Sequence, residues 1–226
     1  MSNQEGAEQD VRVGTWNLEG RWDDRHAAVM DAERCDVWLL TEVSDRAQVD
    51  GWCVTKTAAP MAPARAWAAI WSRQAHQPQP QPHPASAAVR LNDVAFCSSV
   101  LPWRACGNKA PWTAGSTAAK TSAVLTALNS NLPAGELVWG GDWNHSLIGR
   151  EFVGSMAGRS DIEDLLAARG LVAATADLPS AVEGVRSIDH IAAPRDWPVV
   201  AHRRVVAAMD GVRLSDHDAY VVDLQR

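Results

Sequence analysis

The sequence has little cysteine and no excess of positive charge. Its 226 residues include only four cysteines, and none of these stands in a Cys-x-x-Cys spacing. Their arrangement argues against zinc ribbons and disulfide frameworks, so we expect free and mostly buried thiols. The formal net charge of −6 is unlike the basic footprint of many nucleic-acid-binding proteins, although a local basic rim can serve the same purpose in an acidic protein.

Long apolar runs are also missing. No stretch approaches the length of a membrane span, and residues 1–10 are polar and acidic, which is not the chemistry of a signal peptide. We expect a cytoplasmic protein with a disordered lead over 1–10 and a single domain over 11–226, because this length suits one core better than two. Nothing in the sequence indicates an obligate protein partner.

Tryptophan dominates the aromatic residues. The chain has 11 Trp, 2 Phe and 1 Tyr. Since tryptophan here replaces the phenylalanine and tyrosine of an ordinary core, we expect most of these rings to be buried and a few to line a groove.

Short apolar runs alternate with segments of helical spacing. Helices are predicted over 23–34, 116–129 and 160–169, the last from a capping-box spacing at its start. Residues 77–84 alternate Gln or His with Pro and predict an exposed loop in the polyproline conformation. The consecutive strands favour two packed sheets with helices outside, a layered α+β arrangement, with an open α/β sheet as the alternative. The predicted strands are 11–16, 36–41, 51–56, 65–72, 87–91, 93–100, 137–140, 186–192, 197–207 and 218–224.

Five short polar motifs follow or interrupt the predicted strands. Asp and Asn are common after strands because their side chains satisfy turn backbones, so each motif alone is more typical of a turn than of a catalytic site. Together, at the ends of rigid strands, they indicate a cleft. The motifs are Thr15-Trp16-Asn17-Leu18-Glu19, Thr41-Glu42, Gly141-Asp142-Trp143-Asn144, Ser187-Ile188-Asp189-His190-Ile191 and Ser215-Asp216-His217.

In this order, the five motifs resemble those of the endonuclease/exonuclease/phosphatase superfamily, which includes DNase I-like nucleases, abasic-site endonucleases and inositol or sphingolipid phosphatases. The resemblance covers residues 11–224, nearly the whole chain. It implies a four-layer α/β/β/α sandwich of the DNase I type, in which two packed mixed sheets are flanked by helices. It also implies hydrolysis of a phosphate ester with bound Mg²⁺, for which Mn²⁺ can substitute.

The resemblance makes Glu42 the principal metal ligand, with Glu19 and Asp216 in support, directly or through water. The residue types agree with this role, since Mg²⁺ prefers hard oxygen ligands and keeps several of its waters. One or two carboxylates and a substrate phosphate are then sufficient to hold the ion.

The resemblance also implies catalytic roles for five residues. Asp142 orients or deprotonates the attacking water, and Asn144 contacts the phosphate. His217 hydrogen-bonds a non-bridging oxygen and stabilises charge in the transition state, while Asp189 binds the other ring nitrogen of His217. Asn17 orients a ligand or donates to a phosphate oxygen.

The remaining histidines are expected to be structural. His190 is expected to pack or to point away from the site. Surface positions are expected for the others, which are His26, His76, His83, His145 and His202.

One position departs from the family pattern. Family members usually carry His or Tyr where this chain has Val100, and Val can neither donate to a phosphate nor shuttle a proton. We expect Arg104 or Lys109 to take over the phosphate contact; slower catalysis and loss of activity are the alternatives. Trp103 and Trp112 alternate with these basic residues, which suits stacking on bases as well as burial under a surface loop.

Three functions remain open from the sequence. A nuclease that cleaves DNA or RNA phosphodiesters is the leading interpretation, with nucleic acid as the substrate. A phosphatase or phosphodiesterase on a small or lipid-derived ester is the second, since the composition is acidic and the chain compact. A catalytically silent module that binds nucleic acid or phosphate is indicated only by Val100.

Overall fold

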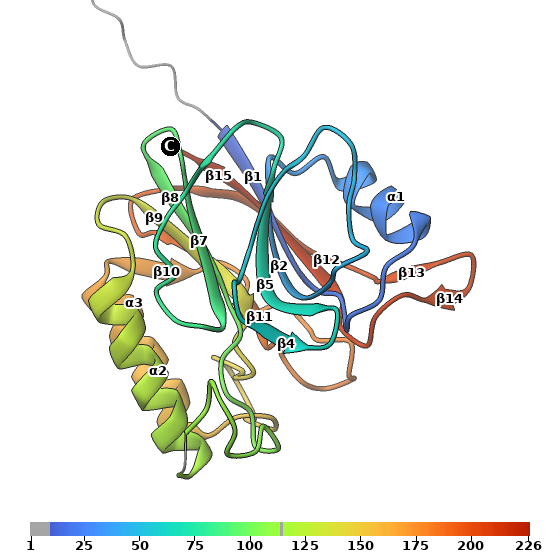
Figure 1. Ribbon diagram of the computed structural model, residues 1–226. Helices are drawn as coiled ribbons and strands as arrows, with labels where there is room; N and C mark the ends of the chain where they lie inside the picture. The colour runs from blue at the N-terminus through green and yellow to red at the C-terminus, as the bar shows by residue number, and fades with distance from the viewer. Residues whose placement is uncertain (1–9, 114) are drawn as a thin grey trace, which may run out of the picture.

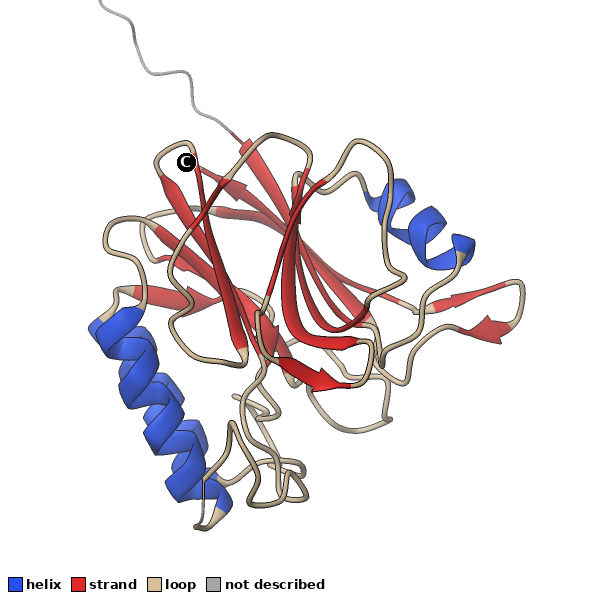
Figure 2. Cartoon of the chain, viewed as in Figure 1, coloured by secondary structure: helices blue, strands red, loops and turns tan. Residues whose placement is uncertain are grey.

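The computed structural model describes residues 10–113 and 115–226. They form four layers, of which the inner two are β-sheets and the outer two are helices (Figure 1). The lead predicted over 1–10 lies outside the described residues except for Asp10, which begins the first strand. Strands make up most of the regular structure, and the helices lie on two opposite sides of them (Figure 2).

The first sheet has seven strands and contains both ends of the described chain. Its order is β12-β15-β1-β2-β5-β3, with β4 also paired to β5. Strands β1 and β2 run parallel, and the other neighbours are antiparallel. The strands are β1 (Asp10–Asn17), β2 (Val37–Ser44), β3 (Cys53–Lys56), β4 (Pro60–Ala62), β5 (Arg65–Ser72), β12 (Val199–Val205) and β15 (Ala219–Gln225).

The second sheet has six strands in the order β10-β11-β9-β8-β7-β6. Strands β8 and β9 run parallel, and the other neighbours are antiparallel. A small separate hairpin is formed by β13 (Ala208–Met209) and β14 (Val212–Arg213). The six strands are β6 (Gln77–Pro78), β7 (Ser86–Leu91), β8 (Val94–Ser99), β9 (Leu137–Asp142), β10 (Leu171–Ala173) and β11 (Asp189–Pro194).

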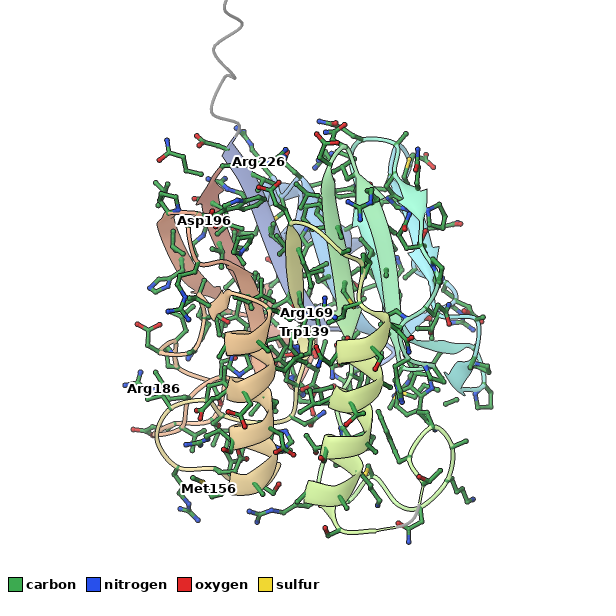
Figure 3. All side chains as sticks on the ribbon, turned by 90° about the vertical axis from the view of Figure 1, so that its left-hand side faces the viewer. Trp139, Met156, Arg169, Arg186, Asp196 and Arg226 are labelled. Carbon is green, nitrogen blue, oxygen red and sulfur yellow. The ribbon has the colours of Figure 1, made fainter. Side chains whose placement is uncertain are left out.

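Three helices form the outer layers. Helix α1 (Asp24–Glu33) packs on the first sheet, whereas α2 (Thr117–Asn131) and α3 (Met156–Ala168) lie side by side over the second sheet (Figure 3). This arrangement confirms the predicted α/β/β/α sandwich and excludes the open α/β sheet. No helix within 10–113 and 115–226 has the length and apolarity that crossing a membrane requires.

Three hydrophobic cores separate the four layers. Successive side chains of a strand point to opposite faces of its sheet, so one strand contributes to two cores. In β2, Val37 and Leu39 pack between the sheets, while Trp38 and Leu40 pack under α1. The burial of β2 on both faces explains its continuous apolar run. The third core, which includes Trp139, lies between the second sheet and helices α2 and α3.

Tryptophan fills much of these cores, as the composition predicts. Trp139 and Trp143 stack with their ring centroids 4.1 Å apart, next to the end of β9. Such rings bury large apolar areas with few rotatable bonds. The buried tryptophans are Trp16, Trp38, Trp67, Trp71, Trp112, Trp139, Trp143 and Trp197.

Helix α3 begins earlier than predicted. Its N-cap is Ser155, whose hydroxyl accepts a hydrogen bond from the Gly158 N–H at 3.0 Å. The capping-box spacing that begins at Ser160 lies inside the helix, so the predicted start is wrong. The reason is backbone geometry: an N-cap needs extended dihedrals, and Ser155 has them with φ −143° and ψ 153°.

The segment 77–84 is partly a sheet edge. Strand β6 pairs its two residues with β7 at the outer edge of the second sheet, where Pro78 fits because an edge strand does not need every donor. The sequence also failed to predict β4, β10, β13 and β14. These strands have two or three residues each, which is too short for a periodic pattern to appear.

All four cysteines are free, as predicted. Cys35 and Cys97 are buried, whereas Cys53 and Cys106 are partly exposed. Burial raises the pKa of the Cys97 thiol to about 12, so this side chain acts as a small apolar residue.

Two glycines allow the close packing at the end of β9. Gly141 has a φ of +118°, and an added Cβ would lie 2.3 Å from the Ser99 carbonyl oxygen. At Gly140 an added Cβ would lie 2.5 Å from the His190 carbonyl oxygen and 2.8 Å from Leu39 Cδ1 in the first sheet. Only glycine fits these positions without a shift of the backbone.

Gly141→Ala is expected to lower the free energy of unfolding by about 2–4 kcal/mol, through overpacking against Ser99 and a strained backbone. Gly135→Ala is the matched control, because Gly135 also has a positive φ of 89° but no atom lies within 4 Å of an added Cβ. It is expected to cost only about 1 kcal/mol, from the backbone alone. Urea unfolding measures both variants, and equal losses would contradict the close approach at Gly141.

Candidate active site

The polar motifs meet at one edge of the sandwich, where strands of both sheets end. In the first sheet, β1 ends at Asn17 and β2 carries Glu42. In the second sheet, β9 ends at Asp142, and its partner in the antiparallel pair is Asp189, the first residue of β11. His217 comes from the loop before β15. The edge therefore unites residues that are far apart in sequence on rigid elements.

The side-chain amide of Asn17 joins the two sheets. Its Nδ2 donates to Glu42 Oε1 at 3.2 Å and to Asp142 Oδ2, across the sheets, at 2.9 Å. Its Oδ1 accepts from the backbone N–H of Glu19 at 2.9 Å. Because both amide hydrogens are used, Asn17 positions two carboxylates and keeps no donor for a phosphate.

Three of the predicted site residues have left-handed backbones. The φ values are +53° at Glu19, +51° at Glu42 and +54° at Asn144. This conformation is unfavourable for residues with a Cβ and is found mostly where the surrounding structure enforces it. At this edge it turns the chain sharply just after, or within, strands β1, β2 and β9.

Asp189 and His217 form a hydrogen-bonded pair. His217 Nδ1 and Asp189 Oδ2 are 2.7 Å apart. Serine hydroxyls fix both backbones, since the Asp189 N–H donates to Ser187 Oγ and the His217 N–H donates to Ser215 Oγ. His217 Nε2 has no hydrogen-bond partner within 10–113 and 115–226, and it lies 3.9 Å from Asp216 Oδ1. This nitrogen is available to a ligand.

Ionisable groups are crowded at this edge. One atom each from Asp142, Asp189 and His217 lies within 4.8 Å of the others. Burial alone would lower the pKa of His217, but the charges of Asp189 and Asp142 outweigh it and raise this pKa well above 6.5. Burial, and then repulsion from Asp189, raises the pKa of Asp142 to about 7. Burial also raises the pKa of Asp189, against the attraction of His217. His217 is thus a cation near neutral pH, where Asp142 titrates.

The three predicted metal ligands differ in their surroundings. Glu42 Oε2 accepts from Arg65 Nη1 at 2.8 Å, and the Glu42 side chain is 18% exposed. Glu19 is held by Arg21 at 3.0 Å and by the Asp216 N–H at 3.1 Å. Glu42 and Asp216 line the cleft beside the site, whereas Glu19 is not part of its lining.

The donors at this edge suit a hard divalent cation. Carboxylates from Glu42, Asp142, Asp189 and Asp216 line one cleft, and no cysteine lines it. Asp189 Oδ1 is buried without a hydrogen-bond partner among the described residues. Oxygen ligands of this kind favour Mg²⁺ or Mn²⁺ over softer metals, and a cation would relieve the mutual repulsion that raises the carboxyl pKa values.

A cleft of about 530 Å³ lies beside these groups. Part of its lining is acidic, and no Lys or Arg belongs to it. Much of the remaining lining is apolar, so the cleft combines an acidic part with an apolar part. The apolar lining residues are Met61, Trp103, Phe152, Val153, Ala181, Val182 and Ile188.

The two tryptophans predicted to bind substrate have different positions. Trp103 is partly exposed and lines the cleft. Trp112 is only 2% exposed and is a core residue, which corrects the role predicted for it. Its ring packs edge-on against Trp67 at 5.3 Å and stacks on His83 at 5.6 Å, so it fills the space under the loop.

A buried apolar side chain, Val100, stands where the family pattern has His or Tyr. Val100 is 1% exposed and belongs to the core under α2 and α3. Arg104 is exposed, and its Nε donates to the Gly154 carbonyl at 2.8 Å. Lys109 is also exposed. Neither Arg104 nor Lys109 lines the cleft, so their expected contact with a phosphate stays a prediction.

Two histidines predicted at the surface are buried. His145 is fully buried, with Nδ1 2.8 Å from the Trp143 carbonyl and its own carbonyl 2.9 Å from His190 Nε2. His190 packs, as predicted, and burial lowers its pKa to about 4. His26 is also buried and completes the capping box of α1 with Asp23. Both surface predictions fail because contacts with distant elements bury the two rings.

Two charged residues at the site have no motif that indicates them. Arg65 begins β5 and reaches Glu42 across the sheet. Asp218 is fully buried on its side chain, lines the cleft, and pairs with Arg204 and Arg213. Its position directly after the Ser-Asp-His motif is the one sequence signal that could have found it.

Comparisons with protein-family models and with curated protein sequences give no match. Solved structures do match. They include the endonuclease domain of TRAS1, a telomere-specific non-LTR retrotransposon (14% identity, 96% of this chain and 98% of that chain, TM-score 0.63). They also include the AP endonuclease LMAP from Leishmania major (13%, 96% and 88%, 0.66). A third is an endonuclease/exonuclease/phosphatase protein from Beutenbergia cavernae (20%, 96% and 72%, 0.62).

These likenesses extend over nearly the whole chain and agree in architecture with the two packed sheets and their outer helices. Identities this low establish the fold and leave the activity to the site itself. The chain has the DNase I-like fold of the endonuclease/exonuclease/phosphatase superfamily, the family that its five motifs resemble.

Proposed function

We propose that this protein is a Mg²⁺-dependent phosphoesterase that cleaves DNA or RNA phosphodiester bonds by metal-assisted attack of water. The observation that carries the proposal is the crowding of Asp142 with the Asp189–His217 pair, within 4.8 Å, in a cleft that Glu42 also lines. A base, a cationic donor and a metal ligand around one volume are what this reaction needs. An AP endonuclease and a retrotransposon endonuclease domain share the fold.

Asp142 is assigned to the attacking water. Asn17 Nδ2 donates to one of its oxygens at 2.9 Å, and the Asn144 N–H donates to the other at 3.0 Å. Both oxygens are therefore fixed, and the carboxylate presents its remaining lone pairs in one orientation. A pKa of about 7 suits a base that accepts a proton at neutral pH.

His217 is assigned to the phosphate. As a cation it donates from Nε2 to a non-bridging oxygen and stabilises the negative charge that grows in the transition state. Asp189 positions the ring and keeps the proton on it. Asn144 Nδ2 uses one hydrogen on the Leu101 carbonyl at 3.0 Å, which leaves the second hydrogen for a phosphate oxygen.

Glu42 is assigned as the principal metal ligand, supported by Asp216 and, through water, by Glu19. When bound, Mg²⁺ supplies a Lewis acid that polarises the phosphate and neutralises charge on the leaving oxygen. Asn17 keeps the Glu42 carboxylate turned toward Asp142. Val100 offers no proton to the leaving oxygen, so substrates with stable leaving groups are favoured.

A phosphodiesterase on a small or lipid-derived ester is the second candidate. The cleft has no Lys or Arg in its lining, and one part of that lining is apolar. Such walls suit a phosphate ester with an apolar substituent better than a polyanion. A catalytically silent module has only Val100 in its favour, because a binding protein does not need a buried carboxylate with a pKa near 7.

Asp142→Asn is expected to lower kcat by a factor of about 10²–10⁴, with an unchanged fold, because the variant cannot accept a proton from water. The substrates are plasmid DNA, single-stranded DNA, RNA and bis-p-nitrophenyl phosphate, each with Mg²⁺, Mn²⁺ or EDTA. Asp164→Asn, an exposed position on α3, is the control. Turnover of the small ester alone would favour the second candidate, and no turnover with any metal would overturn both.

Glu42→Gln is expected to raise the Mg²⁺ concentration for half-maximal activity by about 10- to 100-fold, since it removes the principal ligand charge. Mg²⁺ should also raise the melting temperature of the wild-type protein and not that of the variant. Glu163→Gln, which is exposed on α3, should behave as the wild type. Equal stabilisation of Glu42→Gln by Mg²⁺ would rule out this ligand.

The pH profile of kcat/KM is expected to be bell-shaped. Activity rises as Asp142, with a pKa of about 7, loses its proton, and a bound cation moves this limb to lower pH. Activity falls at higher pH as His217 becomes neutral, since its pKa lies well above 6.5. Asp189→Asn should move the alkaline limb down by about 1–2 pH units, because it removes the charge that favours the cation. An unmoved limb would contradict the role of the pair.

A further inference from the structure

A second cavity adjoins the cleft, and its charge is of the opposite sign. It has a volume of about 590 Å³ and is lined by the loop from β1 into α1, by residues near the end of β2, by the turn before β5 and by β14. Arginine is its commonest lining residue, whereas no arginine lines the cleft. The arginines of this arginine cavity are Arg21, Arg25, Arg46, Arg65 and Arg213.

Two ion pairs form a wall between the cleft and the arginine cavity. Arg65 Nη1 lies 2.8 Å from Glu42 Oε2, and Arg213 Nη1 pairs with Asp218 Oδ1. In each pair the carboxylate lines the cleft and the guanidinium lines the arginine cavity. The two spaces are therefore separated by the thickness of an ion pair, so an extended ligand can occupy both.

Arg65 is held in a fixed orientation. Its guanidinium lies over Gly20, where an added Cβ would be 2.2 Å from Arg65 Nε and 2.4 Å from Nη2. The glycine thus leaves the space that the guanidinium occupies. One of its five N–H donors is used by Glu42, which leaves a rigid group of donors at the wall.

Arg46 supplies charge without a partner. Its exposed side chain has no ion pair or hydrogen bond in the part of the chain that the structure describes, where only its backbone N–H binds Ser44 Oγ. The other four arginines pair with Asp23, Glu19, Glu42 and Asp218. Four of the five guanidinium groups that line the arginine cavity therefore lie against a carboxylate, and Arg46 is the one without such a partner among the described residues.

We propose that the arginine cavity binds a second phosphate of the substrate, adjacent along a single nucleic-acid strand to the phosphate that is cleaved. This inference rests on the proposed function and names its substrate as a polymer. Guanidinium groups recognise phosphate through paired N–H donors. The cleft receives one phosphate ester with its neighbouring nucleoside, and the basic rim that nucleic-acid binding requires lies in the next cavity.

Arg46→Ala tests the proposal, because Arg46 has no structural partner to lose. Fluorescence anisotropy with labelled oligothymidylate of 12 residues in EDTA measures binding without catalysis. The variant is expected to bind about tenfold more weakly and to lower the salt slope of log K by about 0.7. Arg195→Ala is the matched control, since Arg195 is exposed beyond the far end of β11. Hydrolysis of bis-p-nitrophenyl phosphate, which has a single phosphate, should be unchanged in both variants.

The outcomes separate this inference from the proposed function. Equal oligonucleotide binding by Arg46→Ala and Arg195→Ala, with intact ester hydrolysis, would overturn the second phosphate site alone. The opposite result is also informative. If the wild-type protein hydrolyses no ester, but Arg46→Ala binds the oligonucleotide more weakly than the wild type, the proposed function is overturned and the second phosphate site is retained. Arg46→Glu should abolish binding at low salt if the site exists, and wild-type protein that binds no oligonucleotide at low salt would overturn it.

Discussion

The hydrogen bonds from the Asn17 amide to Glu42 and Asp142 are the interaction on which the site depends. They tie the end of the first sheet to the end of the second, so the distance between the Glu42 and Asp142 carboxylates is fixed by one planar group. Loss of this amide would leave two carboxylates free to move apart under their own repulsion. The packing of the sheets, close at Gly140, brings the partners within reach, and the amide sets their orientation.

Crowded charge is the second constraint. Burial and mutual repulsion raise the pKa of Asp142 to about 7, while the same carboxylates hold His217 as a cation. A carboxyl group that titrates near neutral pH and a cationic imidazole therefore coexist within a few ångströms, which neither group would achieve in water. The arrangement is a strained electrostatic balance, and the rigid strands that carry it resist its relaxation.

Much of this could be predicted from the sequence, because the chemistry lies at strand ends, where local patterns mark both the strand and its polar terminus. The same patterns could not predict the burial of His145, which depends on close packing against Gly154 and Gly158 around the start of helix α3. The sequence left Trp112 open between stacking on bases and burial under a surface loop, and only its packing against Trp67 in the folded chain shows burial. Arg65 belongs to no motif in the sequence, and its place at the site is visible only from its contacts with Glu42 and Gly20 in the fold.

The left-handed backbones at Glu19, Glu42 and Asn144 have an evolutionary consequence. At each position glycine would relieve strain but remove the chemistry, so folding and function pull the sequence in opposite directions. Purifying selection has to maintain these side chains against the local conformational preference. In a duplicated gene freed from that selection, these three codons would drift toward glycine early, so glycine there would mark the loss of the side chains that form this site.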